Sequence, residues 1–475
     1  MSGSLDAVLS KPPLTALPKK MPKRPNILFL MSDEHRADVT GYEGNSVIRT
    51  PVLDELARTG VVFRNAYTPS PICVPGRQCI TAGQLPKTCH CEGWIDLEPG
   101  YRTIPREFSR YAYITACSGK LHHDGPDQMQ GWKIRLSPDA EISDHHIADK
   151  IAEEFARYTP APGTGKWSNQ RELEEARPGD GPSQQFDRRA TTAALDFLER
   201  YFQDPLYHRP QSHRPLLFNL SLLQPHYPYF TTQELFDYYL DRVPIHSEKP
   251  CNHPVLSQSQ QSQPVNVSDD TTRRATATYY GMIETIDTYY GQVMKKLEAL
   301  GENLEEWIII YTSDHGEMLG EHGIWEKTRF YEASVRVPLI IRWPKSFAGG
   351  RIINENVNLC DLFATLCDMA GLEIPPGLDS RSLLPLLQGN AAAWNNESIS
   401  QMGRDHIMIK RDSLKYQYYG GKIPEVLFDL KADPRETTNV AASPAYAKAM
   451  SEFRSRLANL GHGPNADPNY KNAGY

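Results

Sequence analysis

The chain has 475 residues, with 51 lysines and arginines against 58 aspartates and glutamates, and a formal net charge of −7 at pH 7. This balance excludes the basic surplus that is typical of nucleic-acid-binding proteins. A content of 40% hydrophobic and 23% charged residues is typical of a folded globular protein. Apolar runs such as residues 27–31 are far shorter than the roughly 18 residues of a membrane-spanning helix. We therefore expect neither a nucleic acid nor a membrane as a partner.

The first 24 residues predict a polar leader without the apolar core of an export signal. They contain Asp6, Lys11 and several prolines, so we expect a cytoplasmic protein. Eight cysteines in a chain of this length are too few for a disulfide framework, and we expect thiols, metal ligands or catalytic groups. The fragment Cys89-His90-Cys91 has no second pair of ligands that would complete a zinc site.

Four short apolar runs each end in a loop with ionisable side chains. Their β-branched and aromatic content predicts strands at residues 26–31, 113–117, 216–223 and 307–312. The loops after these runs carry, in chain order, Asp33 and Glu34, Lys120 and His122, His226, and Asp314 and His315. Because ligands bind at the carboxyl ends of parallel strands, we expect the four loops to form a single site. For any one loop taken alone, the alternative is a solvated surface loop.

Helical patterns separate these runs. The clearest covers residues 272–300, with one apolar face, Asp269 or Asp270 as its N-terminal cap, and Gly301 at its end. A second covers residues 192–202. Strands that alternate with helices predict an α/β fold, here a large and mostly parallel sheet sandwiched by helices.

The last part of the chain has a different pattern. A polar linker at residues 388–396 precedes short alternating runs and a helix at about residues 444–460, which predicts a small α+β subdomain with an antiparallel sheet. We therefore expect a leader at 1–24, an α/β domain at 25–390 and a C-terminal subdomain at 391–475. Two polar stretches, 161–182 and 247–270, predict surface insertions, and a rim over the site is the alternative.

Two adjacent pairs of residues predict a metal site. Asp33-Glu34 and Asp314-His315 close two of the expected strands, about 280 residues apart. Carboxylate-rich loops with one imidazole suit a divalent cation such as Ca²⁺, Mg²⁺ or Mn²⁺. The alternative is a set of surface acids near helix N-termini, where negative charge is favourable. The residues alone leave both interpretations open.

A cysteine on a stiff turn is the second candidate. Cys73 lies between Pro71 and Pro75, and Arg77 places a fixed cation nearby. Buried cysteines are usually inert core residues, so a core thiol is the alternative to a nucleophile.

The segment Cys73-x-Pro75-x-Arg77, with Gly83 downstream, resembles the signature of the sulfatase family of the alkaline phosphatase superfamily, in which a modifying enzyme oxidises the cysteine to formylglycine. Other elements resemble the family in its own order: the opening strand and acidic pair at 26–34, Gly-Lys-x-His at 119–122, Pro-His-x-Pro at 225–228, the second metal loop at 312–320 with Lys327, and the closing segment at 428–439.

The sequence also departs from the family pattern. Gly76 stands where sulfatases most often have Ser, and Ala82 where they usually have Thr. Glu34 and His315 stand where many sulfatases have Asp and Asn. The Asp-His pair resembles the branch that contains phosphonate monoester hydrolases and choline-sulfatase-like enzymes.

The resemblance implies a role for each candidate residue. As the hydrated formylglycine, Cys73 would be the nucleophile, and Arg77 would stabilise its alkoxide. His226 would protonate the leaving alcohol, and His122 would deprotonate the remaining hydroxyl to expel sulfate. Lys120 and Lys327 would bind and neutralise the sulfuryl oxygens. The implied metal ligands are Asp33, Glu34, Cys73, Asp314 and His315.

The implied activity is the hydrolysis of a small sulfate monoester to an alcohol and inorganic sulfate. The implied cofactor is one divalent metal ion, calcium first, with manganese or magnesium as alternatives, and the implied maturation partner is a formylglycine-generating enzyme. A phosphonate monoester or phosphodiester hydrolase on the same scaffold stays open, as does a non-catalytic binding protein in which Cys73 remains a thiol. The sequence is compatible with a homo-oligomer. The aromatics that would line either a pocket or the core are Trp94, Trp132, Tyr227, Tyr229 and Trp325.

Overall fold

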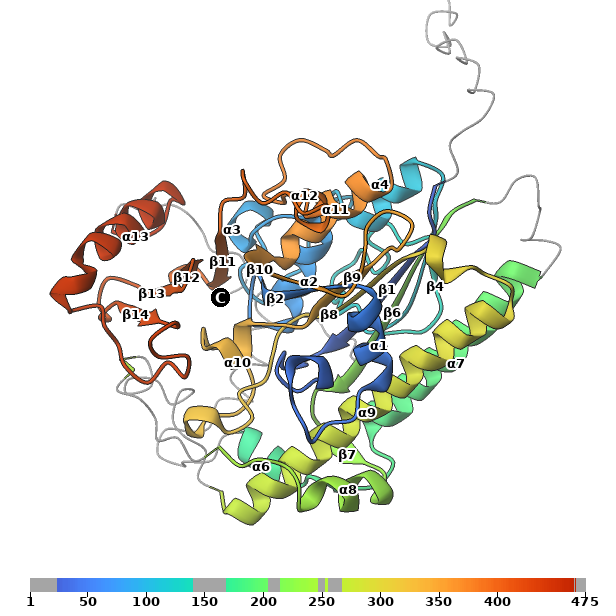
Figure 1. Cartoon of the computed structure of the whole chain (residues 1–475), viewed down its shortest axis with the longest axis horizontal. Helices are drawn as coiled ribbons and strands as arrows, with labels where there is room; N and C mark the ends of the chain where they lie inside the picture. Colours follow the sequence, from blue (N-terminus) through green and yellow to red (C-terminus); the bar gives the residue numbers. More distant parts are fainter. Residues whose placement is uncertain are drawn as a thin grey trace, which may run out of the picture.

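A large sheet runs through the centre of the computed structural model, which describes residues 24–139, 168–203, 214–246, 253–254, 267–464 and 466 (Figure 1). Within these residues the sheet has eight strands in the order β10-β2-β9-β8-β1-β6-β3-β4. The strands are β1 (Ile27–Asp33), β2 (Val61–Tyr67), β3 (Ile114–Gly119), β4 (Ile134–Arg135), β6 (Leu216–Pro225), β8 (Ile308–Ser313), β9 (Leu339–Arg342) and β10 (Arg351–Asn358). Only β9 runs antiparallel to its neighbours. The predicted mostly parallel sheet is therefore confirmed, and its four predicted strands are β1, β3, β6 and β8.

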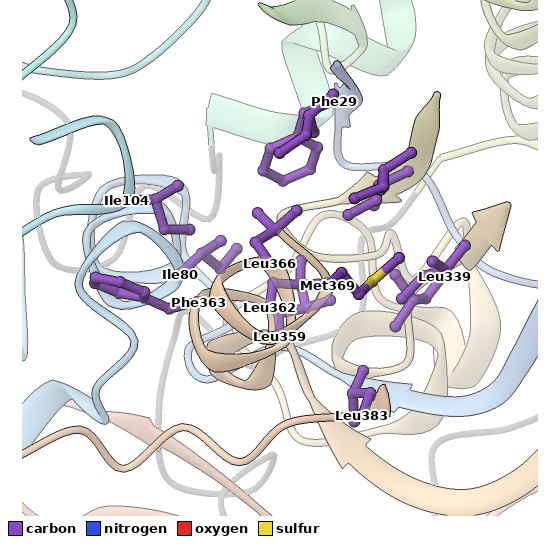
Figure 2. Packing of buried hydrophobic residues seen from close by; sticks show 14 of the residues in the cluster. Phe29, Ile80, Ile104, Leu339, Leu359, Leu362, Phe363, Leu366, Met369 and Leu383 are labelled. Atoms are coloured by element: carbon purple, nitrogen blue, oxygen red, sulfur yellow. The ribbon is translucent and has the colours of Figure 1, made fainter. Parts of the chain in front are cut away.

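Helices cover both faces of the sheet. Side chains alternate along β1, so that Phe29 points to one face and Leu30 to the other. The Phe29 face packs against α2 (Cys73–Ala82), α4 (Ile104–Arg110), α11 (Leu362–Met369) and α12 (Leu384–Leu387) (Figure 2). The Leu30 face packs against α1 (Pro51–Thr59), α7 (Pro182–Gln203) and α9 (Asp269–Ala299). No described helix is both long and apolar enough to cross a membrane.

The remaining elements are short. The helices are α3 (Pro86–Cys89), α6 (Ser168–Glu174), α8 (Gln233–Leu240), α10 (Glu332–Val335) and the 3₁₀ turns Gly41–Glu43, Leu304–Glu306, Glu321–Gly323, Leu359–Asp361 and Pro444–Tyr446. The strands β5 (Arg177–Pro178) and β7 (Phe230–Thr231) pair with each other in a separate two-stranded ladder.

The two predicted helices are present, and both are longer than predicted. The N-cap of α9 is Ser268, whose hydroxyl accepts a hydrogen bond from the Thr271 N–H. The prediction of Asp269 or Asp270 as the cap is wrong, because Ser268 already has the extended backbone of a cap and both acids lie in the first turn. Gly301 follows the end of the helix with φ 86°, as expected for a glycine in this position.

Residues 168–182 are folded against the sheet domain. They form α6, β5 and the start of α7, and the side chains of Leu173 and Ala176 are buried in the cluster that contains the α9 residue Tyr279. Most of these residues are exposed or half-buried, as a surface insertion would be, but the prediction missed their helix and strand. A few apolar contacts are enough to fix a segment whose composition is mostly polar. The rest of that stretch lies outside the described residues, as do residues 1–23 and most of 247–270.

A second, antiparallel sheet follows, drawn at the left of Figure 1. Its strands are β11 (Glu397–Met402), β12 (His406–Arg411), β13 (Leu414–Tyr419) and β14 (Val426–Asp429). Helix α13 (Ala447–Asn459) packs on it, with the Phe453 and Tyr416 rings stacked at 5.3 Å. The predicted antiparallel sheet with a helix is confirmed, and β11 is a strand that the sequence pattern did not predict. The buried Lys415 joins this sheet to α10 by an ion pair with Glu332 at 2.9 Å, and it also pairs with Glu436, which follows β14.

A buried histidine makes the stability of the fold sensitive to acid. Burial lowers the pKa of His123 to about 4, whereas in the unfolded chain a histidine titrates near about 6.5. Between these values the unfolded chain binds a proton that the native chain does not, so stability falls as the pH falls through this window. One such histidine lowers the free energy of unfolding by about 2 kcal/mol between pH 7 and pH 5.

Between pH 7 and pH 5, we therefore expect the free energy of unfolding to fall by about 2 kcal/mol less in His123→Gln than in the wild type. Urea denaturation of both proteins at pH 7 and pH 5 measures the difference. Glutamine can still donate to the Gln128 carbonyl that His123 Nδ1 contacts at 3.2 Å. Equal losses in the two proteins would contradict the assignment of His123 as a neutral buried group.

Candidate active site

Four neighbouring strands, in the order β8-β1-β6-β3, end at one edge of the large sheet and place ionisable side chains there. Each strand of this group pairs in parallel with its neighbour, so the carboxyl ends of all four lie at the same edge of the sheet. Nine of the ten sequence-predicted site residues are joined here by direct contacts, and His122 lies beside them, close enough for its pKa to respond to Lys120. The nine are Asp33, Glu34, Cys73, Arg77, Lys120, His226, Asp314, His315 and Lys327.

Four potential metal-binding side chains converge at the centre of the site. One ligand atom from each of Asp33, Cys73, Asp314 and His315 lies within 4.8 Å of the others, and all four side chains are buried. The Cys73 sulfur is 3.0 Å from His315 Nε2 and 3.6 Å from Asp33 Oδ1. Buried carboxylates at this spacing repel each other, and a cation between them relieves the repulsion. The donor set of oxygens, one imidazole and the residue 73 side chain fits a hard or borderline divalent cation.

Glu34 belongs to a second, overlapping group with Asp33 and His226. Its Oε2 accepts a hydrogen bond from Lys327 Nζ at 2.9 Å, while its buried Oε1 has no partner among the described residues. The backbone of Glu34 is left-handed, with φ 66°, which is uncommon for a residue other than glycine and clusters at functional sites.

Arg77 holds the two aspartates in place. Its Nη2 donates to Asp33 at 2.9 Å and its Nε to Asp314 at 2.7 Å, while Nη1 donates to Ser221 Oγ at 2.9 Å and to the Lys120 carbonyl at 2.8 Å. Burial opposes the ionisation of Asp33, but the positive charges of Lys120, His226 and Arg77 together hold its pKa well below the usual range. The guanidinium therefore compensates buried negative charge from two strands.

Helix α2 begins at Cys73, so the N–H groups of its first turn point toward the site and favour negative charge there. Pro75 is tolerated in this turn because its missing N–H would have no partner in the helix. At Gly76 an added Cβ would lie 2.9 Å from the Ser70 carbonyl oxygen, which gives a physical reason for glycine at this position. Burial and the charge of Asp33 raise the pKa of the Cys73 thiol well above its usual value.

Lys120 and His122 follow β3. The Lys120 ammonium is 2.9 Å from Asp33 Oδ2. Gly119 before it has φ 93°, and an added Cβ would lie 1.9 Å from the Ser221 carbonyl oxygen, so only glycine fits. Neither ring nitrogen of the buried His122 has a hydrogen-bond partner among the described residues, and Nε2 lies 3.8 Å from Asp124. This distance is too long for the hydrogen bond of a satisfied histidine–aspartate pair.

His226 and Lys327 face each other. Lys327 Nζ is 2.8 Å from His226 Nε2 and 5.0 Å from the centre of the Tyr227 ring, on which the His226 ring packs at 4.2 Å. Burial and the charge of Lys327 lower the pKa of His226 well below its usual value. Both neighbours of Lys327 are left-handed, Glu326 with φ 64° and Thr328 with φ 66°. Such a backbone is strained in a β-branched residue and is retained where function requires it.

Three residues that support the site were not predicted. Asp187 on α7 accepts hydrogen bonds from the Gln224 backbone N–H and side-chain amide, both at 2.9 Å, just before His226. Tyr279 on α9 donates to the Glu34 carbonyl at 2.6 Å. Glu317 accepts two backbone N–H bonds within the loop after β8. Asp187 and Tyr279 lie within helices, where a sequence pattern gives no sign of a contact with a distant loop.

The five candidate aromatics divide between site and core. Tyr227 packs under His226, and Trp94 meets the His122 ring edge-on at 5.6 Å. Tyr229 and Trp325 are buried in a cluster against α9, and Trp132 is buried on the sheet face. Only the first two are in ring contact with candidate catalytic side chains.

Comparisons with known proteins agree with this geometry. The family model "Sulfatase" matches residues 25–372, and the model "N-sulphoglucosamine sulphohydrolase, C-terminal" matches residues 320–462. The chain is 30% identical over 446 residues to a choline-sulfatase of Rhizobium meliloti, covering 89% of this chain and 83% of that protein. It is 28% identical over 467 residues to an arylsulfatase of Clostridium perfringens, covering 91% and 94%.

Solved structures share the fold. A phosphonate monoester hydrolase of Agrobacterium radiobacter superposes with a TM-score of 0.72 at 22% identity, covering 92% of this chain and 95% of that one. The structure of BT4656 in complex with D-glucosamine-2-N,6-O-disulfate superposes with a TM-score of 0.72 at 21% identity, covering 92% and 97%. At these identities the likeness establishes the architecture and leaves the substrate open.

Proposed function

Because the chain belongs to the sulfatase family of hydrolases, we propose that it cleaves a small sulfate monoester into an alcohol and inorganic sulfate. One observation carries the proposal: Cys73 lies at the start of α2, among the ligand atoms of Asp33, Asp314 and His315. Family membership makes sulfuric esters the expected class of substrate.

The metal ligands that we propose are Asp33, Asp314, His315 and the residue 73 side chain, with Glu34 beside them. The fit rests on the buried carboxylates and on the unpartnered Oε1 of Glu34. Calcium is the first candidate, and the nitrogen ligand favours manganese as the alternative, with magnesium third. When bound, such a cation lowers the pKa of a hydroxyl on residue 73 and neutralises charge on the sulfuryl group.

The nucleophile that we propose is an oxygen of residue 73, after a formylglycine-generating enzyme has converted the cysteine to an aldehyde that hydrates to a diol. This oxygen attacks sulfur, and the bond between sulfur and the alcohol oxygen breaks as His226 gives that oxygen its proton. Burial and the charges of Lys327 and Lys120 lower the pKa of His226, and the bound sulfuryl group would compensate these charges, so that His226 can hold this proton in the complex. His122 then removes the proton of the second hydroxyl, sulfate leaves, and the aldehyde is restored. A neutral His122 suits this step, since burial and the charge of Lys120 lower its pKa.

The cationic residues of the site have separate roles in this scheme. Lys120 and Lys327 neutralise the sulfuryl oxygens as charge moves in the transition state. Arg77 acts on the nucleophile through its charge, and it also keeps Asp33 and Asp314 in place.

The state of Cys73 tests the mechanism. In protein purified from its native host, we expect the tryptic peptide of residues 65–77 to carry an aldehyde that reacts with a hydrazide probe, as read by mass spectrometry. An active protein with an unmodified Cys73 would exclude the formylglycine mechanism. An inactive protein whose Cys73 stays a thiol, even when it is co-expressed with a formylglycine-generating enzyme, would favour a non-catalytic binding protein.

A phosphonate monoester or phosphodiester hydrolase is the second candidate. The Asp314-His315 pair favours it, and a singly charged phosphorus ester has the shape and charge that the same lysines would bind. Turnover of a matched pair, phenyl sulfate and phenyl methylphosphonate, separates the two. A higher kcat/KM for the phosphonate would replace the sulfatase proposal.

Asp187 offers a test of the role of His226. We expect Asp187→Asn to lower kcat/KM about 10²-fold for an alkyl sulfate and only a few-fold for 4-nitrophenyl sulfate, because a poor leaving group depends more strongly on a well-placed proton donor. The asparagine N–H₂ would face one of the N–H groups whose hydrogen bonds Asp187 now accepts, and two donors cannot bond to each other. Initial rates with both esters measure the split.

The matched control is Asp196→Asn, an exposed position on the same helix that pairs with Arg200 at 3.6 Å. It should leave both rates unchanged. Equal losses for the two esters in Asp187→Asn would mean that Asp187 supports the fold without positioning His226.

We also propose a division of the chain into a catalytic domain at 25–390 and a C-terminal subdomain at 391–475, preceded by the leader at 1–24. Its support is that the second sheet begins at β11. We propose the cytoplasm as the compartment of this protein. This proposal is supported by the seven described cysteines, which are free and buried.

A further inference from the structure

Arg329 is a cation without an acidic partner in the described part of the chain. It lies two residues after Lys327. Among the described residues its hydrogen bonds run only from Nη1 to the Thr328 carbonyl, at 2.7 Å, and to Thr328 Oγ1, at 2.5 Å. Its Nε is buried and meets no acceptor there. The other cations of the site differ, because Arg77 and Lys120 each pair with a buried aspartate.

The position of Arg329 links the site to the second sheet. On one side, the Thr328 N–H donates to the Pro71 carbonyl at 3.0 Å, just before the start of α2. On the other side, the Phe330 carbonyl accepts from Gln417 on β13, and the Phe330 ring lies 5.7 Å from the Tyr419 ring. Arg329 therefore lies between the nucleophile helix and the C-terminal sheet, beyond the lysine that we assign to the sulfuryl group.

Two histidines near Arg329 supply no negative charge to compensate it. Burial lowers the pKa of His253 to about 4 and also lowers that of His406, and the charge of Arg329 contributes to both shifts. Burial lowers the pKa of Arg329 itself, with Glu326 as the one carboxylate that opposes this shift. Glu326 forms no ion pair with Arg329, and its charge also acts on the neighbouring Lys327.

The geometry of the free guanidinium edge indicates what it binds. With Nη1 engaged by Thr328, the Nε and Nη2 donors remain side by side. This edge binds two oxygens of a carboxylate or a sulfate in parallel. Arg329 is half-buried as a whole, while its Nε is shielded from solvent and has no acceptor among the described residues. An unpartnered buried donor costs stability, and an anionic ligand on this edge would relieve that cost.

We propose that Arg329 forms a subsite for a second anionic group, a carboxylate or a sulfate, on the alcohol part of the substrate. The inference rests on the proposed function and narrows it to sulfate esters of acidic alcohols. Lys327 is assigned to the sulfuryl group, and Arg329 lies two residues further along the same loop, next to the residue that contacts the second sheet. The two cations would therefore bind two different groups of one substrate.

Matched pairs of esters test the subsite. The first set is phenyl sulfate with its 3-carboxy and 4-carboxy derivatives, and the second pair is N-acetylglucosamine 6-sulfate with glucosamine 2-N,6-O-disulfate. We expect the wild type to prefer the dianion within at least one set, by about tenfold or more in kcat/KM. A preference within the phenyl sulfate set would identify a carboxylate as the second anionic group, and a preference within the sugar pair would identify a sulfate.

Arg329→Gln should abolish the preference and leave kcat/KM for the singly charged partner within about threefold of the wild type. Arg329→Lys should restore part of it, because the charge returns without the two-donor edge. The control is Arg58→Gln, which makes the same charge change on an exposed side chain of α1. Equal losses for both members of a pair, or a wild type without any preference, would overturn the proposal.

Binding measurements separate this inference from the proposed function. If the modified wild type hydrolyses none of the sulfate esters, the proposed function fails. Calorimetry with 3- and 4-hydroxybenzoate, with phenol as the neutral reference, then tests the subsite alone. Binding of a hydroxybenzoate that is lost in Arg329→Gln supports the subsite, and equal binding by both proteins rejects it.

Discussion

Replacing Cys73 with alanine is expected to lower kcat/KM for sulfate esters by about 10⁴-fold or more, because the variant lacks the atom that attacks sulfur. Initial rates with 4-nitrophenyl sulfate measure the loss. The control is Cys79→Ala, which removes a buried thiol from the same helix, away from the site's ligand atoms. We expect it to keep activity within about tenfold of the wild type.

Cys73→Ser adds a sharper outcome. A serine has one hydroxyl, so it can accept the sulfuryl group but offers His122 no second hydroxyl from which to expel sulfate. We expect a single turnover at most, with the sulfuryl group retained on the peptide of residues 65–77. Continuous turnover by the serine variant at wild-type rates would contradict the two-hydroxyl scheme and the role given to His122.

Arg77→Met is expected to lower the free energy of unfolding by about 3–5 kcal/mol, because it leaves two buried carboxylates without the cation that bridges them. Arg77 pairs with Asp33 at 2.9 Å and with Asp314 at 2.7 Å, and both acids are fully buried. Urea denaturation in the presence of a chelator measures the effect without a contribution from bound metal.

The pH dependence of this loss follows from Asp33. Its folded pKa is depressed, with burial opposed by Lys120, His226 and Arg77, so the stability it contributes is present above its unfolded pKa and lost as the pH falls. The gap between the wild type and Arg77→Met should therefore narrow below about pH 4. The control Arg110→Met, at an exposed arginine beside Glu107, should cost less than about 1 kcal/mol. A comparable loss in both variants would contradict the bridging role.

The site was predictable because each of its parts has a local signal. Asp33, Lys120, His226 and Asp314 each follow an apolar run, and a parallel sheet brings such ends together whatever the distance along the chain. The order of these motifs along the chain, together with the segment around Cys73, then resembled one family of hydrolases.

Contacts between distant elements left no such signal. Asp187 lies near the start of α7, and nothing in the pattern around it indicates that it receives hydrogen bonds from the end of β6, just before His226. The capping role of Ser268 was missed because two acids in the next positions are equally good caps by residue type. Polar composition concealed α6, since the contacts of Leu173 and Ala176 depend on a helix that lies about a hundred residues further along the chain.

The Lys415 link between the second sheet and α10 bears on how this enzyme can diverge. Lys415 holds Glu332, which stands three residues after Arg329, so the placement of β13 sets the placement of that loop. A mutation in the last quarter of the chain can therefore shift the segment that carries Arg329 without touching Cys73, Asp33 or Asp314. Substitutions in the C-terminal sheet are therefore a route to a changed preference for the alcohol part of the substrate that leaves Cys73 and the ligand atoms around it unaltered.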